Sequence, residues 1–241
     1  MNQHNPVWLG TAGWSLPREQ WPAFGREGTH LARYATRLPA VEINSSFYRP
    51  HRPATYARWA GSVPDGFRFC VKIPKVISHE RRLVDCGDPL ARFLDECAHL
   101  GDTLGCLLLQ LPPSLVYEPP LAAAFIEALR ARHEGLVAIE PRHPSWLAAE
   151  PLLRDARIAR VAADPAPFAG ADAPGGWVGM RYYRLHGSPR TYYSSYPDDW
   201  LDRLATRLAE EPADTPTWCI FDNTASGAAT ANALGLQQRL G

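Results

Sequence analysis

The sequence predicts a single (β/α)8 TIM-barrel-like domain that spans residues 1–241. Eight short apolar runs alternate with helical patterns, which is typical of parallel strands joined by right-handed crossovers. The length of 241 residues matches that of such a barrel, and no linker or internal repeat divides the chain. A doubly wound open sheet is the alternative. The first strand, however, leads into Gly13-Trp14-Ser15 rather than into a glycine-rich phosphate fingerprint.

The predicted strands are short runs of apolar side chains bounded by turn-forming residues. They cover residues 7–13, 40–45, 67–73, 106–111, 136–142, 158–164, 179–186 and 217–222. The residues between them predict helices near 29–38, 53–60, 89–100, 119–132, 145–156, 198–210 and 227–239. The third helix is the clearest, because Asp88 suits an N-cap, Pro89 suits the first turn and Gly101 suits the end. One helix is missing, since residues 165–176 are rich in Pro, Gly and Ala and predict a loop after the sixth strand.

Composition excludes several classes of protein. The apolar fraction is 46%, the charged fraction is 21% and the formal net charge is zero, so the charge footprint of a dedicated nucleic-acid binder is absent. No apolar run approaches the ~20 residues that span a bilayer, and residues 1–6 lack the features of a secretory signal. We therefore expect a cytoplasmic protein without a membrane partner. Five cysteines without Cys-x-x-Cys spacing predict free, buried thiols.

Polar side chains occur near the ends of nearly all the predicted strands. Side chains alternate between the two faces of a strand, so if Val41 and Ile43 pack on helices, Glu42 and Asn44 point into the barrel. The same alternation directs polar side chains inward from strands three, four, five and seven: Lys72, Gln110, Glu140, Arg142, Arg184 and His186. Asp164 ends strand six. Asp222 and Asn223 end strand eight, where the alternation leaves the facing open.

This polar ring has two interpretations. In one, Glu42, Glu140 and Asp164 merely neutralise Lys72, Arg142 and Arg184 in a buried ion network. In the other, the ring is a functional site. The second is favoured because barrel active sites lie at the C-terminal ends of the strands, whereas buried ion pairs stabilise less than the apolar side chains that usually fill a barrel.

Seven short strings carry a family resemblance. They are Gly10-Thr11-Ala12-Gly13-Trp14-Ser15, Val41-Glu42-Ile43-Asn44-Ser45-Ser46-Phe47-Tyr48, Phe67-Arg68-Phe69-Cys70-Val71-Lys72, Leu109-Gln110-Leu111-Pro112-Pro113, Ile139-Glu140-Pro141-Arg142-His143-Pro144-Ser145-Trp146, Tyr183-Arg184-Leu185-His186-Gly187 and Phe221-Asp222-Asn223. In this order the strings resemble the YecE-like family, also called domain of unknown function 72. The resemblance implies a TIM-barrel-like fold and no established reaction, substrate or cofactor. Ala12 and Asp222 depart from the family pattern, which has serine and asparagine there, so any role that needs a hydroxyl or an amide at these positions is weakened.

The leading hypothesis is an enzyme with a pocket at the C-terminal face of the barrel for a small anion, either a phosphate or a carboxylate. In it Lys72, Arg142 and Arg184 hold the anion, Glu42 or Glu140 is the general base and His186 is the general acid. Further ligand contacts are expected from four residues of the mouth and from the loop that enters the last helix, whose amides attract anions: Trp14, Asn44, Tyr48 and Gln110, and Asn223, Ser226 and Gly227. No cofactor is expected.

Three alternatives remain open. Glu42 and Glu140 suit a glycoside-type hydrolase, and their distance around the ring favours inversion. Glu140, Asp164 and His186 end consecutive strands and suit a divalent metal. Residues 190–196 interleave tyrosines with hydroxyls, as does a surface that stacks on nucleic-acid bases. Because the net charge is zero, a tyrosine loop that folds over the barrel mouth is favoured over nucleic-acid binding.

Overall fold

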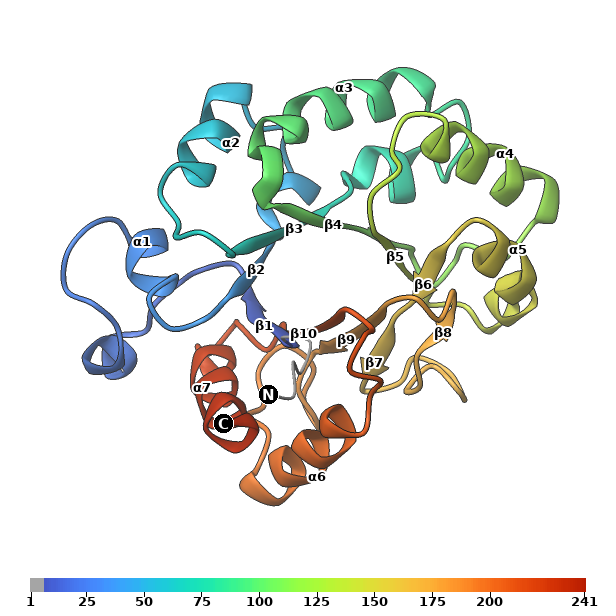
Figure 1. Cartoon of the computed structure of the whole chain (residues 1–241). Coiled ribbons are helices and arrows are strands. Elements are labelled where there is room, and N and C mark those ends of the chain that lie inside the picture. The colour runs from blue at the N-terminus through green and yellow to red at the C-terminus, as the bar shows by residue number, and fades with distance from the viewer. Residues whose placement is uncertain (1–6) are drawn as a thin grey trace.

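The structure, a computed structural model, describes residues 7–241. Its strands form one sheet in the order β7-β9-β10-β1-β2-β3-β4-β5-β6-β8, parallel except for β8 (Figure 1). The strands are β1 Val7–Ala12, β2 Ala40–Ile43, β3 Arg68–Lys72, β4 Leu104–Gln110, β5 Val137–Glu140, β6 Ile158–Arg160, β7 Ala162–Asp164, β8 Gly175–Gly176, β9 Arg181–Leu185 and β10 Thr217–Phe221. The predicted barrel-like fold is confirmed.

The sixth predicted strand closes the ring by dividing in two. Its first half, β6, pairs with β5, and its second half, β7, pairs with β9. Only Val161 separates the halves, and its amide donates to the carbonyl of Ile139 in β5. One chain segment therefore bonds to both neighbours in turn, which brings the sheet nearly full circle.

Within residues 7–241, seven α-helices surround the sheet (Figure 1). They are α1 His30–Tyr34, α2 Pro53–Ala60, α3 Gly87–Cys97, α4 Pro119–Arg130, α5 Glu150–Asp155, α6 Asp198–Ala209 and α7 Ala228–Leu240. Short 3-10 or π turns are η1 Arg18–Ala23, η2 Ser45–Phe47, η3 Val76–Glu80, η4 Ala98–Thr103 and η5 Pro144–Ala149. Residues 165–174 form no helix, so the chain reaches β9 through a loop and the two residues of β8.

Three predicted helices differ most from the structure in their bounds. The first is shorter than predicted, because it ends at Tyr34 and residues 35–37 form a turn. The fifth is a 3-10 turn followed by α5, since Pro151 in the first turn of α5 has no amide to extend a helix through that point. In the third, Cys86 rather than Asp88 is the N-cap, and Asp88 lies in the first turn of α3. Gly101 has a positive φ of 54° after this helix, inside η4.

The apolar side chains of the strands form two layers, one on each face of the sheet, and this packing sets the direction in which the side chains point. The outer layer joins the sheet to the helices and contains Val41 and Ile43 of β2 and the corresponding residues of the other strands. The inner layer fills the barrel with small and aromatic side chains: Ala12, Ala40, Cys70, Cys106, Leu108, Ala138, Ala159, Val161, Met180, Tyr182, Trp218 and Ile220. Glu42, Lys72, Glu140 and Arg184 alternate with the outer layer, which confirms their inward facing.

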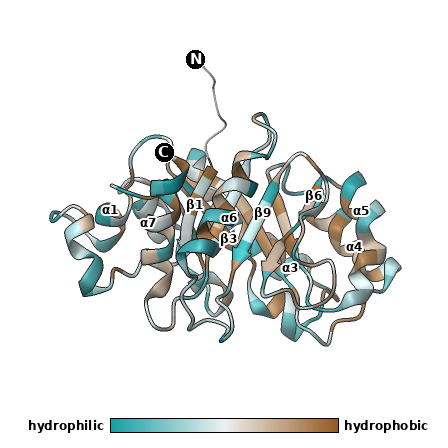
Figure 2. Cartoon of the chain, turned by 90° about the horizontal axis from the view of Figure 1, so that it is seen from below, coloured by the Kyte–Doolittle hydropathy of each residue, from teal (hydrophilic) through white to brown (hydrophobic). Residues whose placement is uncertain are grey.

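Hydropathy follows the same layers. Figure 2 shows hydrophobic residues gathered in the central strands, whereas β9 stands out as partly hydrophilic because it carries Arg181 and Arg184. Within residues 7–241, no helix has both the length and the apolar character needed to cross a bilayer. The prediction about a secretory signal concerns residues 1–6, which lie outside the described part of the chain.

Candidate functional site

Arg184 is the centre of a buried ion cluster inside the C-terminal half of the barrel. Its Nε and Nη2 donate to the two carboxylate oxygens of Glu42, at 3.0 and 2.8 Å. Nη1 donates to Glu140 Oε2 at 2.9 Å, and Nη2 lies 2.9 Å from Asp222 Oδ2. Tyr182 completes the shell by donating its hydroxyl to Glu42 Oε2 at 3.1 Å. The guanidinium is therefore satisfied by protein carboxylates, which leaves Arg184 with no nitrogen free to hold a ligand.

His186 is the second centre, one level nearer the mouth. Its Nδ1 lies 3.0 Å from Asp222 Oδ2, and its Nε2 lies 2.8 Å from Glu140 Oε1. Arg142 forms an ion pair with the same Glu140 oxygen, and its Nη2 lies 2.8 Å from His186 Nε2. Because ionised carboxylates only accept, each ring nitrogen of His186 faces an acceptor, and Nε2 faces the Arg142 donor as well.

The charges of this cluster hold one another ionised. Burial alone would raise the pKa of Glu140, but Arg142, Arg184 and His186 hold it well below its usual range. Burial would likewise raise the pKa of Asp222, and Arg184 and His186 lower it. The pKa of Arg184 is raised well above its usual value, because its three carboxylates outweigh burial. Both carboxyl groups are thus anionic at neutral pH.

Lys72 differs from the other cluster cations because it forms no ion pair with a described carboxylate. It ends β3, is 4% exposed and lies with Nζ 4.1 Å from the centre of the Phe47 ring. Burial, and after it the charge of Arg184, lowers its pKa to about 8. Lys72 is the cation of the cluster that remains free for a partner outside it.

A cavity of ≈ 410 Å³ opens at the C-terminal ends of β1 and β2. Three predicted ligand residues, Trp14, Asn44 and Tyr48, line it together with His30 and Ser45, which sequence reasoning missed. His30 begins α1, far along the chain from any strand end, so the alternation of strand side chains gives no signal for it.

Several buried polar atoms near the mouth have no hydrogen-bond partner among the described residues. They include Asn44 Oδ1 and Arg142 Nε, both predicted to contact ligand. A buried polar atom without a partner is costly, and a ligand or an ordered water would remove that cost. Gln110 is half-buried at the end of β4 and faces the same side.

Asn223, Ser226 and Gly227, the predicted anion site after β10, lie against the tyrosine loop of residues 190–196, and two of their side chains bond to it. Asn223 Nδ2 donates to the carbonyl of Ser194 at 2.9 Å, and Ser226 Oγ donates to the carbonyl of Tyr193 at 2.6 Å. Gly227 precedes α7 with a φ of 80°, and a side chain there would meet Pro17 at 2.9 Å. Asn223 Oδ1 is buried without a partner. Ligand binding by these three residues stays a prediction.

This loop covers the barrel mouth, as the tyrosine pattern predicted. Tyr192 presents its ring edge to His186, with 5.6 Å between ring centres, and carries a strained positive φ of 70°. Arg190 lies over the Tyr193 ring at 3.9 Å. Tyr192 and Tyr193 remain exposed, so nucleic-acid stacking by residues 190–196 is an untested alternative.

Asp164, a member of the possible metal set, does not join the ion cluster. The β7–β9 register pairs it with Leu185, a side chain of the outer layer, so it points toward the helices. Its carboxylate accepts from Tyr196 at 2.8 Å. Glu140, Asp164 and His186 are therefore not assembled as a ligand set, and the described residues contain no group of three His, Cys, Asp or Glu arranged for a metal. Regular alternation from Ile158, which lies in the outer layer, gives the same facing.

The glycosidase alternative finds little support in the same geometry. Glu42 and Glu140 face each other across the guanidinium of Arg184, and each is at most 1% exposed. All four of their oxygens have partners, so neither is free to meet a sugar or an attacking water.

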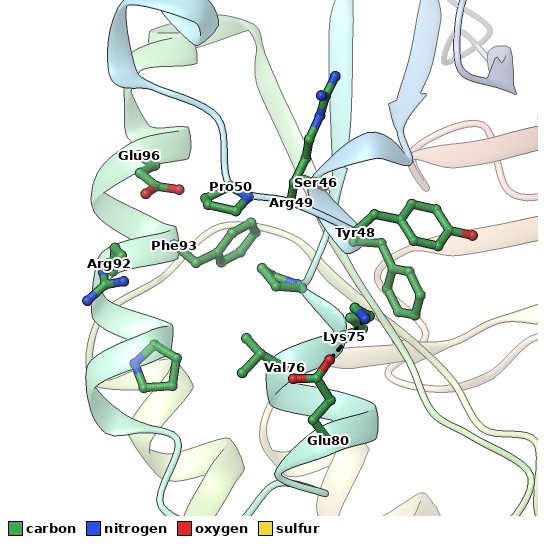
Figure 3. A pocket seen from close by; sticks show the side chains of 13 residues that line it. Ser46, Tyr48, Arg49, Pro50, Lys75, Val76, Glu80, Arg92, Phe93 and Glu96 are labelled. Atoms are coloured by element: carbon green, nitrogen blue, oxygen red, sulfur yellow. Dashed lines mark ion pairs between the residues drawn. The ribbon is translucent and has the colours of Figure 1, made fainter.

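A second cavity, of ≈ 230 Å³, lies between α3 and the segments that follow β2 and β3 (Figure 3). Figure 3 shows Phe93 and Glu96 of α3 on one side and Val76 and Glu80 of η3 on the other. Tyr48 borders both this cavity and the larger one at the mouth.

Comparison with known proteins identifies relatives along most of the chain. The profile of the family described as "Protein of unknown function DUF72" matches residues 8–241. The UPF0759 protein YecE of Escherichia coli K12 is 34% identical over 143 residues, which are 59% of this chain and 50% of that protein. The chain thus matches about half the length of this curated relative.

Solved structures show the same fold. A DUF72 family protein from Enterococcus faecalis V583 superposes with a TM-score of 0.81 at 22% identity, over 98% of this chain and 95% of that chain. Another from Thermotoga maritima MSB8 has a TM-score of 0.76 at 22% identity, over 97% and 98% of the two chains. At these identities the likeness establishes the barrel and nothing about chemistry.

Proposed function

The chain belongs to the DUF72 family of proteins of unknown function, and we propose that it is an enzyme for a small phosphate- or carboxylate-bearing molecule. The ligand would enter at the C-terminal mouth of the barrel. Lys72 and Arg142 would hold its anionic group, while Asn44 and Gln110 would contact its polar atoms. Arg184, named above as an anion ligand, would instead orient the carboxylates beneath.

The observation that carries this proposal is the unpartnered cation Lys72 beside an otherwise saturated ion cluster. Three carboxylates, Glu42, Glu140 and Asp222, face Arg184 and Arg142 within contact distance. His186 faces two of these carboxylates and adds a further group able to carry positive charge. A buried cation without a partner is unfavourable, and an anionic ligand would supply that partner.

Acid–base chemistry would fall to His186. Asp222 holds its Nδ1 side, and Nε2 would exchange a proton with substrate after Arg142, which contacts it at 2.8 Å, moves toward the ligand. His186 is buried under Tyr192, so the tyrosine loop would have to move to admit substrate. Glu42 and Glu140 suit a positioning role better than that of general base, because their oxygens are all engaged.

Calorimetric titration with inorganic phosphate and with malonate tests the binding step. We expect the unmodified chain to bind at least one of them and Arg142→Met to bind at least about tenfold more weakly, since a charged hydrogen bond is lost. Arg203→Met is the matched control, because Arg203 is exposed and pairs only with Asp199 on the same helix. Equal affinity in a folded Arg142→Met protein would refute the proposed pocket.

A second measurement separates an enzyme from a binding protein. In D₂O, we expect the chain to accelerate hydrogen exchange at the carbon beside the carbonyl of dihydroxyacetone phosphate, followed by NMR. His186→Asn should keep phosphate binding and lose the exchange, because asparagine carries no transferable proton. If both proteins bind phosphate and neither accelerates exchange, the acid–base part of the proposal fails.

A further inference from the structure

Lysine is rare in this chain, and its two lysines have opposite surroundings. Lys72 and Lys75 are the only lysines among the 25 lysine and arginine residues. Lys75 is half-exposed and pairs with Glu80 at 3.0 Å (Figure 3). Lys72 is buried at the end of β3 beside the proposed anion site. Arginine, which cannot lose its proton, supplies the other 23 of these positive charges, so Lys72 and Lys75 are the only side-chain amines and Lys72 is the buried one.

The groups around Lys72 come from six segments: η2, η3, β2, β5, β9 and the residue that follows β10. Phe47 of η2 lies beneath its Nζ, and His79 of η3 packs against Phe47 with 5.0 Å between ring centres. The charged groups that act on it are Arg184, which disfavours the ammonium, and Glu42, Asp222 and Glu140, which favour it. Burial lowers the pKa of His79, so its imidazole is neutral at neutral pH and able to relay a proton.

The segment that follows Lys72 is strained. It contains the π turn η3, a conformation that is rare and frequent at functional sites. Three non-glycine residues after it have positive φ: Arg82 at 52°, Leu83 at 71° and Asp85 at 49°. Such backbone costs free energy and persists where the surrounding structure imposes it, often beside reactive groups.

We propose that Lys72 forms a covalent imine with an aldehyde or ketone carbonyl of the anionic ligand. This inference rests on the proposed function: the ammonium form of Lys72 would attract the phosphate or carboxylate together with Arg142, and its neutral form would then attack the carbonyl while Arg142 keeps the anionic group. The substrate class is therefore a small phosphorylated or carboxylated carbonyl compound.

The reaction balances without any co-reactant. The neutral amine attacks the carbonyl carbon, a C–N bond forms and the C=O π bond breaks to give a carbinolamine. The nitrogen passes a proton to the oxygen, a second proton arrives, and the C–O bond breaks to release water. Overall, the ammonium and the carbonyl give a protonated imine and one water. Burial, and after it the charge of Arg184, favours the neutral amine that begins the sequence, and His79 would relay the protons.

Reductive trapping tests the imine. The full chain is incubated near pH 7.5 with glycolaldehyde phosphate and sodium cyanoborohydride, and the labelled peptides are identified by mass spectrometry. At this pH an amine with a pKa of about 8 is roughly a quarter neutral, against about 0.1% for an ordinary lysine. Of the two lysines, we expect Lys72 to carry the adduct, formed at least about tenfold faster than on Lys75; labelling of the α-amino group is counted separately. Equal labelling of the two lysines, or labelling of Lys75 alone, would overturn the inference.

Two variants control for folding. Lys75→Met should leave the adduct unchanged. Lys72→Arg keeps the charge that faces the carboxylates and should abolish the adduct while the circular dichroism spectrum is retained. A Lys72→Arg protein that is labelled to the same extent would contradict the assignment. Lys72→Met serves as the second test of the position if arginine disturbs the packing against Phe47.

Uncharged glycolaldehyde separates this inference from the proposed function. If inorganic phosphate binds by calorimetry but no adduct forms on Lys72, the imine is wrong and the anion pocket stands. If glycolaldehyde and its phosphate label Lys72 with the same concentration dependence, and phosphate does not compete, the imine stands and the anion pocket is wrong. Preference for the phosphorylated aldehyde with competition by phosphate supports both.

Discussion

At the residue scale, Arg184 neutralises three buried carboxylates at once. Arg184→Met would leave Glu42, Glu140 and Asp222 without their main partner in a low-dielectric interior. We expect a loss of about 3–5 kcal/mol in the free energy of unfolding, measured by urea titration. Arg203→Met, which breaks an exposed pair, should change it by less than about 1 kcal/mol. Similar small losses in both variants would show that the cluster does not depend on Arg184.

The same ion cluster should make the free energy of unfolding depend on pH in the acid range. The pKa values of Glu140 and Asp222 are depressed in the folded state, so the stability they contribute is present above their unfolded values, about 4, and is lost as pH falls through the folded values. We expect the free energy of unfolding to fall steeply below about pH 4. Glu140→Gln should flatten this part of the curve. If the free energy of unfolding of the variant falls below pH 4 as steeply as that of the unmodified protein, the depressed pKa of Glu140 is contradicted.

Individual positions were predictable from the alternation of strand side chains, whereas their partners were not. Val41 and Ile43 beside Glu42 suffice to predict which side chain points inward. The bond between Arg184 and Glu42 joins residues 142 positions apart, and it depends on the tilt and register of the closed ring. Asp164 shares the outward face with Leu185, so its polarity alone does not bring it to the ion cluster.

At the element scale, β1 and β2 approach each other through Gly10. A Cβ at this position would lie 2.1 Å from the carbonyl oxygen of Ala40, a backbone atom that cannot move without disrupting β2. We expect Gly10→Ala to cost about 3 kcal/mol or more in the free energy of unfolding, by urea titration. Gly87→Ala is the control, because nothing lies within 4 Å of its added Cβ and it should shift stability by less than about 1 kcal/mol. Equal stability of the two variants would argue against the close strand contact.

The strands and helices were largely predictable, since the spacing of apolar residues and the positions of turn-forming residues identify them. The role of the loop after β10 was not. Its Ser226 and Gly227 match a helix start that binds anions, yet Ser226 instead fixes the tyrosine loop through the carbonyl of Tyr193. Contacts between two loops depend on the folded chain, and local sequence gives no signal for them.

At the scale of the whole molecule, closing the barrel and building the site are one event. The ion cluster takes residues from β2, β5, β9 and the end of β10, which become neighbours only when β6 and β7 complete the ring. The rhythm of strands and helices predicts eight strand positions. It does not predict that the sixth would divide to pair with both neighbours, because that division depends on the shear of the closed sheet.

The central claim is that an anion binds at the mouth of the barrel between Lys72 and Arg142. A crystal structure with selenate in place of phosphate, with anomalous data collected at the selenium edge, tests it most directly. We predict an anomalous peak within hydrogen-bond distance of Lys72 Nζ and the Arg142 guanidinium, and its loss in crystals of Arg142→Met. Peaks confined to exposed arginines elsewhere on the molecule, with none at the mouth, would contradict the claim.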